Sequence, residues 1–171
     1  MPAAYALATW IWLPLARPAV FDFFADAGNL ERITPPLLRF RVLTPLPIDL
    51  RKGALIDYRI GLRGVPMTWR TEITLWDPPR AFADAQRRGP YREWIHTHTF
   101  EEQDGGTLMR DKVRYQLAGP APLGRLANAL FVQRDVTHIF EFRHAALQDA
   151  LGVQGRARVG PVTVAPAPHT D

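Results

Sequence analysis

The chain has 171 residues and a formal net charge of +4, with 21 Lys and Arg against 17 Asp and Glu. This is the length of one domain, and a composition of 47% hydrophobic and 22% charged residues excludes disordered, collagen-like and coiled-coil proteins. The chain contains no cysteine and no serine, which excludes disulfides, zinc fingers, iron-sulfur clusters and serine hydrolases.

The positive charge is weak support for nucleic-acid binding. All but two of the 21 cationic residues are arginines, spread in ones and twos from Arg17 to Arg158, whereas a nucleic-acid site needs a cluster or a helical stripe. The N-terminal residues lack a basic segment, and Pro14 and Arg17 interrupt the first apolar stretch well before it reaches the length of a membrane span. We therefore expect a cytoplasmic protein with no nucleic-acid partner and no stable membrane insertion.

Hydrophobic period and turn residues predict the elements in chain order. The first is a strand over residues 4–13, which Pro14 ends. Two short helices follow, one between Pro18 and Gly28 and one that starts at Asn29. The period then changes to two, and turn residues divide the next stretch into six further strands, at residues 37–43, 54–62, 66–76, 80–87, 91–102 and 107–117. Because the links are short, we expect an antiparallel meander.

The last predicted element is a long helix over residues 123–151, with an apolar stripe and Gly152 at its end. A shift of the stripe near residues 133–135 leaves open whether this is one bent helix or two. The remaining residues, 153–171, are rich in Gly, Pro, Ala and Val without a period. We therefore expect one folded domain, residues 1–152, followed by a flexible tail.

The order of these elements predicts a cavity. A sheet of seven antiparallel strands must cover its apolar face, and only the final helix is long enough to do so. A curved sheet that grips a helix commonly leaves an internal space between the two.

A polar cluster is predicted beside this space. Strand alternation places Trp94, His96, His98 and Phe100 on one face, which we take as the inner face because it is aromatic. The same parity on the strands before and after brings carboxylates and an amide to the same region. The predicted cluster consists of Asp84, Gln86, His96, His98 and Asp111.

Four interpretations of this cluster stay open. It is a buried network in which each histidine donates to an aspartate, or a recognition site at the polar end of an apolar cavity. Alternatively, a histidine tuned by a carboxylate acts as a general acid or base, or His-x-His and two carboxylates bind a divalent metal. His-x-His alone is a weak motif, and we expect neither histidine to bind a metal and no cofactor to be present.

Several segments carry a resemblance to a known family. They are Asn29-Leu30-Glu31-Arg32-Ile33-Thr34-Pro35-Pro36, Gly89-Pro90-Tyr91 with the alternating residues Trp94 to Phe100, Asp111 with Tyr115, and Ile139-Phe140-Glu141-Phe142-Arg143. With these the chain resembles, over about residues 4–151, a bacterial ligand-binding branch of the START and polyketide-cyclase-like superfamily, also called the helix-grip or SRPBCC fold. The resemblance implies an α+β fold, in which a curved seven-stranded antiparallel sheet wraps around a long C-terminal helix and two short helices follow the first strand.

The resemblance further implies a deep pocket for an apolar or aromatic small molecule, and it implies no single reaction. The first function is therefore binding of a lipid- or polyketide-like molecule between sheet and helix. The alternative is a polyketide cyclase, aromatase or dehydratase that uses His96 or His98 with Asp84 or Asp111 as acid-base groups, and whether the protein is an enzyme stays open. The ligand's identity and the oligomeric state do not follow from the sequence.

The residues expected to contact this ligand are Tyr58, Trp69, Asp84, Gln86, Trp94, His96, His98, Asp111, Tyr115 and Phe140. For Arg143, on the long helix, two expectations stay open: a solvated or snorkelling side chain, or a salt bridge to Asp111 or Asp84.

Overall fold

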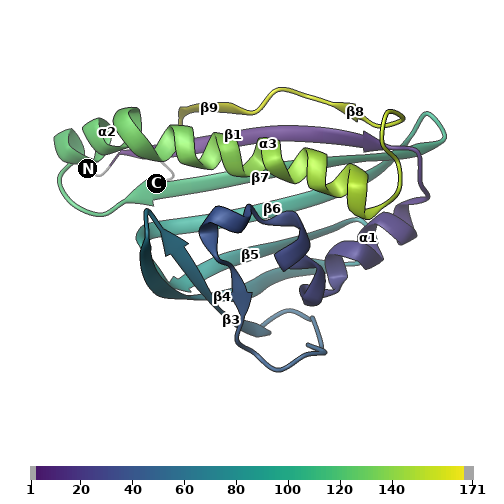
Figure 1. Ribbon diagram of the computed structural model, residues 1–171, viewed down its shortest axis with the longest axis horizontal. Helices are drawn as coiled ribbons and strands as arrows, with labels where there is room; N and C mark the ends of the chain where they lie inside the picture. The colour runs from purple at the N-terminus through teal and green to yellow at the C-terminus, as the bar shows by residue number, and fades with distance from the viewer. Residues whose placement is uncertain (1–2, 168–171) are drawn as a thin grey trace.

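The sheet is antiparallel in every pairing between the described residues, and one long helix lies across it (Figure 1). The computed structural model describes residues 3–167. Its strands are β1 (Ala4–Leu13), β2 (Arg41–Val42), β3 (Leu55–Leu62), β4 (Val65–Asp77), β5 (Ala81–Arg88), β6 (Tyr91–Gln103), β7 (Gly106–Leu117), β8 (Arg158–Val159) and β9 (Thr163–Pro166). Within the described residues they form a nine-stranded sheet in the order β2-β3-β4-β5-β6-β7-β1-β8, with β9 also paired to β1.

The helical segments lie in two groups along the chain. The first group is α1 (Arg17–Ala25), the 3-10 helix η1 (Ala27–Ile33) and the 3-10 turn η2 (Pro36–Leu38). A proline at the start of α1 suits its first turn, and the Asp26 side chain accepts a hydrogen bond from the Gly28 N–H at the start of η1. The second group is α2 (Ala121–Ala127), a π-helical turn η3 (Asn128–Val132) and α3 (Gln133–Ala150).

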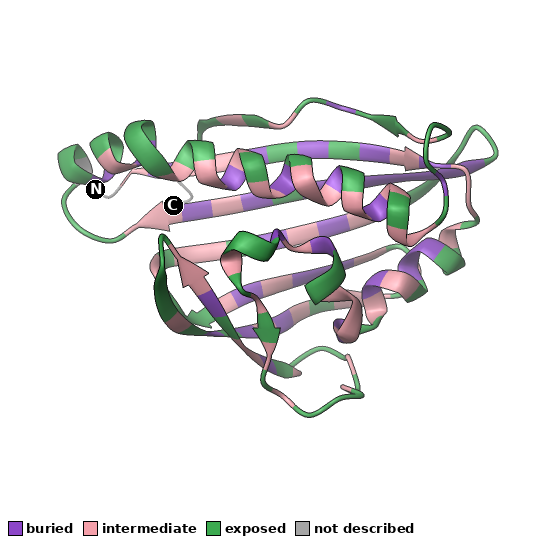
Figure 2. Ribbon diagram, viewed as in Figure 1, coloured by how far each residue is buried: buried purple, intermediate pink, exposed green. Residues whose placement is uncertain are grey.

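The helix α3 packs onto the sheet through one buried stripe (Figure 2). Its buried side chains, Val136, Phe140, His144 and Leu147, recur at intervals of three or four residues, as one face of a helix requires. Val136 and Phe140 pack with inward side chains of β1 and β7, namely Leu7, Val113 and Tyr115. The sheet thus holds α3 over its β1–β7 side.

A second cluster fills the other part of the core. It joins α1 to the ends of β1, β6 and β7, and consists of Ile11, Leu13, Val20, Phe21, Phe24, Ile33, Phe82, Phe100, Met109, Leu147 and Val153. The buried apolar side chains of β3 and β4, Ile56, Ile60, Trp69 and Ile73, belong to neither cluster. They face a cavity instead.

The α+β helix-grip fold and the two short helices after the first strand are confirmed. The expected strand at residues 37–43 is shorter, because Pro36–Leu38 form a 3-10 turn and Arg39 has a left-handed backbone (φ 46°). The expected seven strands are all present in the structure, and two short ones, β8 and β9, come from the tail.

The expectation of a flexible tail is therefore wrong for residues 153–167; the rest of that tail lies outside the described residues. Val153 is completely buried in the core, and β8 and β9 pair with β1. Backbone pairing needs no hydrophobic period, which is why composition failed to indicate it. Gly160 lies against the indole of Trp10, where an added Cβ would come within 2.2 Å of Nε1.

The long C-terminal helix runs from Ala121 to Ala150 without a break, so the alternative of two separate helices is excluded. The π-helical turn falls just before the shift seen in the sequence, and in it Asn128 is buried and accepts a hydrogen bond from the Tyr115 hydroxyl at 2.8 Å. Among the described residues, no helix has both the length and the apolar character needed to cross a membrane.

Candidate functional site

A cavity of about 150 Å³ lies between the sheet, the segment that contains η1 and η2, and α3. Most of its lining is apolar. Seven of the expected ligand-contacting residues line it: Tyr58, Trp69, Asp84, Trp94, His96, His98 and Phe140. The structure therefore brings residues from β3, β4, β5, β6 and α3 to one space.

Aromatic rings form one wall of the cavity. Trp69 meets Trp94 edge to face with ring centroids 5.4 Å apart, and Tyr91 lies 4.8 Å from Trp94. Such tilted and edge arrangements are the preferred geometry of aromatic pairs. The indole N–H of Trp69 is buried and has no hydrogen-bond partner among the described residues, so one donor on this wall is unsatisfied.

Three expected residues do not line the cavity. The Gln86 side-chain amide donates to the Tyr91 carbonyl at 2.6 Å and so closes the β5–β6 turn. Tyr115 is completely buried between the sheet and the helix, with its hydroxyl bound to Asn128. Asp111 lies on β7, where it contacts the two histidines.

The histidines are positioned by this aspartate. Oδ1 of Asp111 lies 2.8 Å from Nε2 of His96, in a hydrogen bond, and 2.8 Å from Nδ1 of His98. The approach to His98 is poorly aligned, so its Nδ1 has no well-formed hydrogen bond. Since one oxygen contacts both rings, Asp111 fixes how the two imidazoles are turned.

Burial decides the protonation states of this group. It lowers the pKa of His98 to about 4, and the neighbouring His96 adds to the effect. Burial alone would raise the pKa of the Asp111 carboxyl, but the two imidazoles, His98 foremost, hold it well below its usual value. At neutral pH, His98 is therefore neutral and Asp111 is ionised.

The tautomers follow from these charges. An ionised oxygen at 2.8 Å must meet an N–H rather than a lone pair, so His96 carries its proton on Nε2 and His98 on Nδ1. The remaining ring nitrogens, Nδ1 of His96 and Nε2 of His98, are then hydrogen-bond acceptors.

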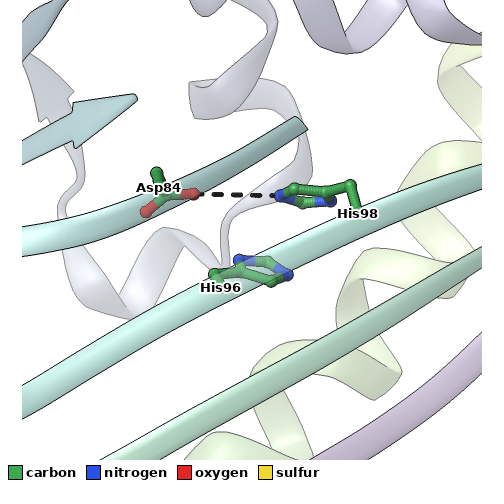
Figure 3. A group of neighbouring side chains, drawn as sticks. All are labelled: Asp84, His96 and His98. Atoms are coloured by element: carbon green, nitrogen blue, oxygen red, sulfur yellow. Dashed lines mark ion pairs between the residues drawn. The ribbon is translucent and has the colours of Figure 1, made fainter. Parts of the chain in front are cut away.

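Asp84 adds a third acceptor to the same place. It lies opposite His96 in the β5–β6 ladder, and its Oδ1 accepts a hydrogen bond from the Thr71 hydroxyl at 2.9 Å. Its Oδ2 faces Nε2 of His98 at 3.9 Å, with the ring of His96 beside them (Figure 3). The ring of His98 is stacked on Phe82 at a centroid distance of 4.2 Å and lies tilted against His96 at 3.8 Å, so its position is well defined.

Arg143 does not form the expected salt bridge to Asp111 or Asp84 among the described residues. It is only partly exposed, it lines the cavity from α3, and within residues 3–167 it forms no ion pair. Its guanidinium lies 5.0 Å from the centroid of the Phe140 ring, and its Nε is buried without a partner. The cavity wall therefore carries a cationic group with an unused donor.

Several lining residues were not among the expected ligand contacts. Ile56, Ile60 and Ile73 had been assigned to strands, and Leu30 to a short helix, but none had a signal that separates a ligand wall from an ordinary core. Phe40 lies in the predicted strand at residues 37–43 and Leu50 in a segment without a period, and neither had a signal for a ligand wall. Such contacts depend on tertiary packing.

An antiparallel sheet that holds a long C-terminal helix over an internal apolar cavity with a polar group defines the class of helix-grip proteins. The family model described as "Polyketide cyclase / dehydrase and lipid transport" matches residues 13–142, well over half of the chain. The chain belongs to this family. A comparison with curated protein sequences found no match.

Solved structures share the fold. A START superfamily protein from Mycobacterium smegmatis has a TM-score of 0.64 at 10% identity, covering 86% of this chain and 97% of that one. The protein Ms6760 from the same organism has a TM-score of 0.63 at 21% identity, covering 86% and 90%. The di-domain ARO/CYC StfQ from the steffimycin biosynthetic pathway has a TM-score of 0.61 at 12% identity, covering 88% and 53%. At these identities the similarity shows the fold alone.

Proposed function

We propose that the cavity binds an apolar, ring-bearing small molecule, lipid- or polyketide-like, whose polar end meets Asp84, His96 and His98. The observation that carries this proposal is the combination, in one internal space, of an aromatic wall with three convergent acceptor atoms. Pockets of this composition take most of their affinity from apolar contact and their orientation from a few polar groups.

Size and chemistry support a ring. A buried apolar cavity of about 150 Å³ is known to hold a molecule of the size of benzene, and this cavity has that volume. Trp69 and Trp94 supply flat apolar area with few rotatable bonds, and each aromatic pair adds roughly 0.5–1.5 kcal/mol beyond burial. The family description and the START superfamily neighbour fit a carrier or sensor of this kind. A cytoplasmic location and the absence of a nucleic-acid partner belong to the same proposal.

The test uses 2-naphthol and its methyl ether as probes, titrated calorimetrically into the full chain in EDTA. The hydroxyl probe donates to the acceptor group whereas the ether cannot, so 2-naphthol should bind more tightly. Trp94→Ala should weaken both probes about two- to tenfold, and His96→Gln should change their ratio. Trp10→Ala, on the outer face, is the matched control.

Equal affinity of wild type, Trp94→Ala and His96→Gln, all folded, would place the site elsewhere. Mass spectrometry of the native protein purified from its own host, in search of a small molecule that co-purifies, then identifies the natural ligand.

A second candidate function is cyclisation or dehydration of a polyketide-like substrate. The observation that favours it is that the neutral His98 contacts the ionised Asp111 through Nδ1, which leaves its Nε2 as the acceptor that a general base needs. Incubation with a linear poly-β-ketone thioester should then give a cyclised product detected by mass spectrometry. His98→Gln should abolish the product while 2-naphthol still binds, and an absence of product from wild type would leave binding as the function.

A further inference from the structure

We infer that Asp84, His96 and His98 form a binding site for one divalent transition-metal ion, with open coordination positions that face the cavity. One ligand atom from each of these residues lies within 4.8 Å of the other two. A metal was one of the four interpretations of this cluster, and the expectation was that neither histidine binds one. The sequence could not show how the rings are turned, and the inference reverses that expectation. This inference does not rest on the proposed ligand.

The first argument is the direction of the lone pairs. Nε2 of His96 and Nδ1 of His98 lie against Asp111. Nε2 of His98 lies toward Oδ2 of Asp84, with the ring of His96 beside them, as the close-up shows (Figure 3). Three acceptors thus converge, and among the described residues no hydrogen bond joins Asp84 to either histidine. Converging acceptors repel one another unless a cation or a donor lies at their centre.

The second argument is charge. Asp111 is nearly completely buried and the side chain of Asp84 is 17% exposed, and neither forms an ion pair with a Lys or Arg among the described residues. Both carboxylates thus lie beside the two imidazoles with no side-chain cation paired to them. A divalent ion would balance both charges in a place where water is scarce.

The third argument is the support behind the ligands. A metal-bound imidazole usually donates its other N–H to a carboxylate, which fixes the ring and raises its basicity. Asp111 takes that position for both rings through one oxygen. Thr71 in turn holds Oδ1 of Asp84 and leaves Oδ2 free.

The geometry requires only small adjustments. Metal–nitrogen and metal–oxygen distances are about 2.0–2.2 Å, so neighbouring ligand atoms are about 3 Å apart. The separation of 3.9 Å between Oδ2 of Asp84 and Nε2 of His98 must shorten by about 1 Å, and separations of up to 4.8 Å within the group by up to about 2 Å, which side-chain rotation can supply. Two imidazoles and one carboxylate suit ions such as Zn²⁺, Fe²⁺ and Co²⁺ and leave positions for water or substrate.

The test is metal binding by the untagged full chain after dialysis against EDTA. Calorimetric titration with Zn²⁺ should give one ion per chain, and Co²⁺ should give ligand-field absorption in the visible range. Asp84→Asn should weaken the affinity at least tenfold, and Asp111→Asn about 10- to 100-fold. His98→Gln should remove the Co²⁺ absorption. His138→Gln, an exposed histidine of α3, is the control and should change nothing.

Circular dichroism checks the fold of each variant. If His98→Gln does not fold, Asp84→Asn decides the question, because it keeps the side-chain volume and the acceptor for Thr71. Absence of stoichiometric binding by wild type, or equal affinity in folded Asp84→Asn, would overturn the inference. The naphthol titrations in EDTA are independent of either result.

Discussion

The carboxylate of Asp111 meets the imidazole of His96 at 2.8 Å, and both side chains are almost fully removed from water. The contact joins β6 and β7, and the same oxygen also faces His98. One carboxylate therefore orients two ring systems that line the cavity without lining it itself.

This contact predicts a large loss of stability for Asp111→Ala. The substitution leaves the buried N–H of His96 without an acceptor, removes the contact with His98 and opens a void, which should lower the free energy of unfolding by roughly 2–5 kcal/mol. Urea denaturation in EDTA measures it. Asp22→Ala, at an exposed position of α1, should change stability by no more than about 0.5 kcal/mol, and an equal effect of both variants would contradict the prediction.

We expect His144 to make the free energy of unfolding fall in acid. Burial lowers its pKa, and its Nε2 lies 3.2 Å from the Thr9 hydroxyl. Because the folded state resists the proton, the unfolded chain takes it up first, and stability falls as the pH drops below about 6.5. His144→Gln should reduce this slope by up to about 1.4 kcal/mol per pH unit, measured by urea denaturation between pH 7.5 and about 5. An unchanged slope would show that His144 titrates alike in both states.

Because of Arg143, we expect the cavity to bind anionic ligands in preference to neutral ones. Its unused donor in the cavity wall should add an attraction for 2-naphthoate that 2-naphthol does not receive. Arg143→Met keeps much of the apolar contact with Phe140, so the fold should persist while naphthoate binding weakens about 10- to 100-fold and naphthol binding changes little. Calorimetry measures both, with the exposed Arg156→Met as control. A parallel loss for both probes would assign Arg143 to packing alone.

We expect the hydrogen bond from the Tyr115 hydroxyl to stabilise the fold at the π-helical turn. Tyr115→Phe removes the only donor to Oδ1 of the buried Asn128 within the described residues. We expect a loss of about 1–3 kcal/mol in the free energy of unfolding, since a buried acceptor is left unpaired. In Asn128→Leu, which lacks that acceptor, adding Tyr115→Phe should cost less than it does in wild type. Equal costs in the two backgrounds would show that the residues are not coupled.

Much of the site was predictable where strand geometry alone decides it. Alternation placed Trp94, His96, His98 and Phe100 on one face, and the structure puts both histidines and Phe100 inside. Short turns fixed which strands are neighbours, and so Asp84 and Asp111 were correctly brought to the histidines.

The errors arise where the strand ladder ends or where tertiary packing decides. The pairing of β5 with β6 stops at Ala85, so strand alternation no longer determines which way the Gln86 side chain points. It turns to the Tyr91 backbone instead. The side chain of Tyr115 lies on the predicted inner face of β7, but the C-terminal helix covers it, so it does not reach the cavity. The direction of the Arg143 guanidinium depends on Phe140 and on the cavity, which no spacing on the helix reveals.

The pairing of β8 and β9 with β1 has a consequence for self-association. Without them the ten-residue strand β1 would present a long row of free N–H and C=O groups, which is a template for another chain. The strands that cover it are two and four residues long, Pro161 stands between them and Pro166 ends the second. Proline cannot donate to a ladder, so this side of the sheet offers an incoming strand only short, interrupted stretches to pair with. The C-terminal segment thereby protects the protein against edge-to-edge aggregation.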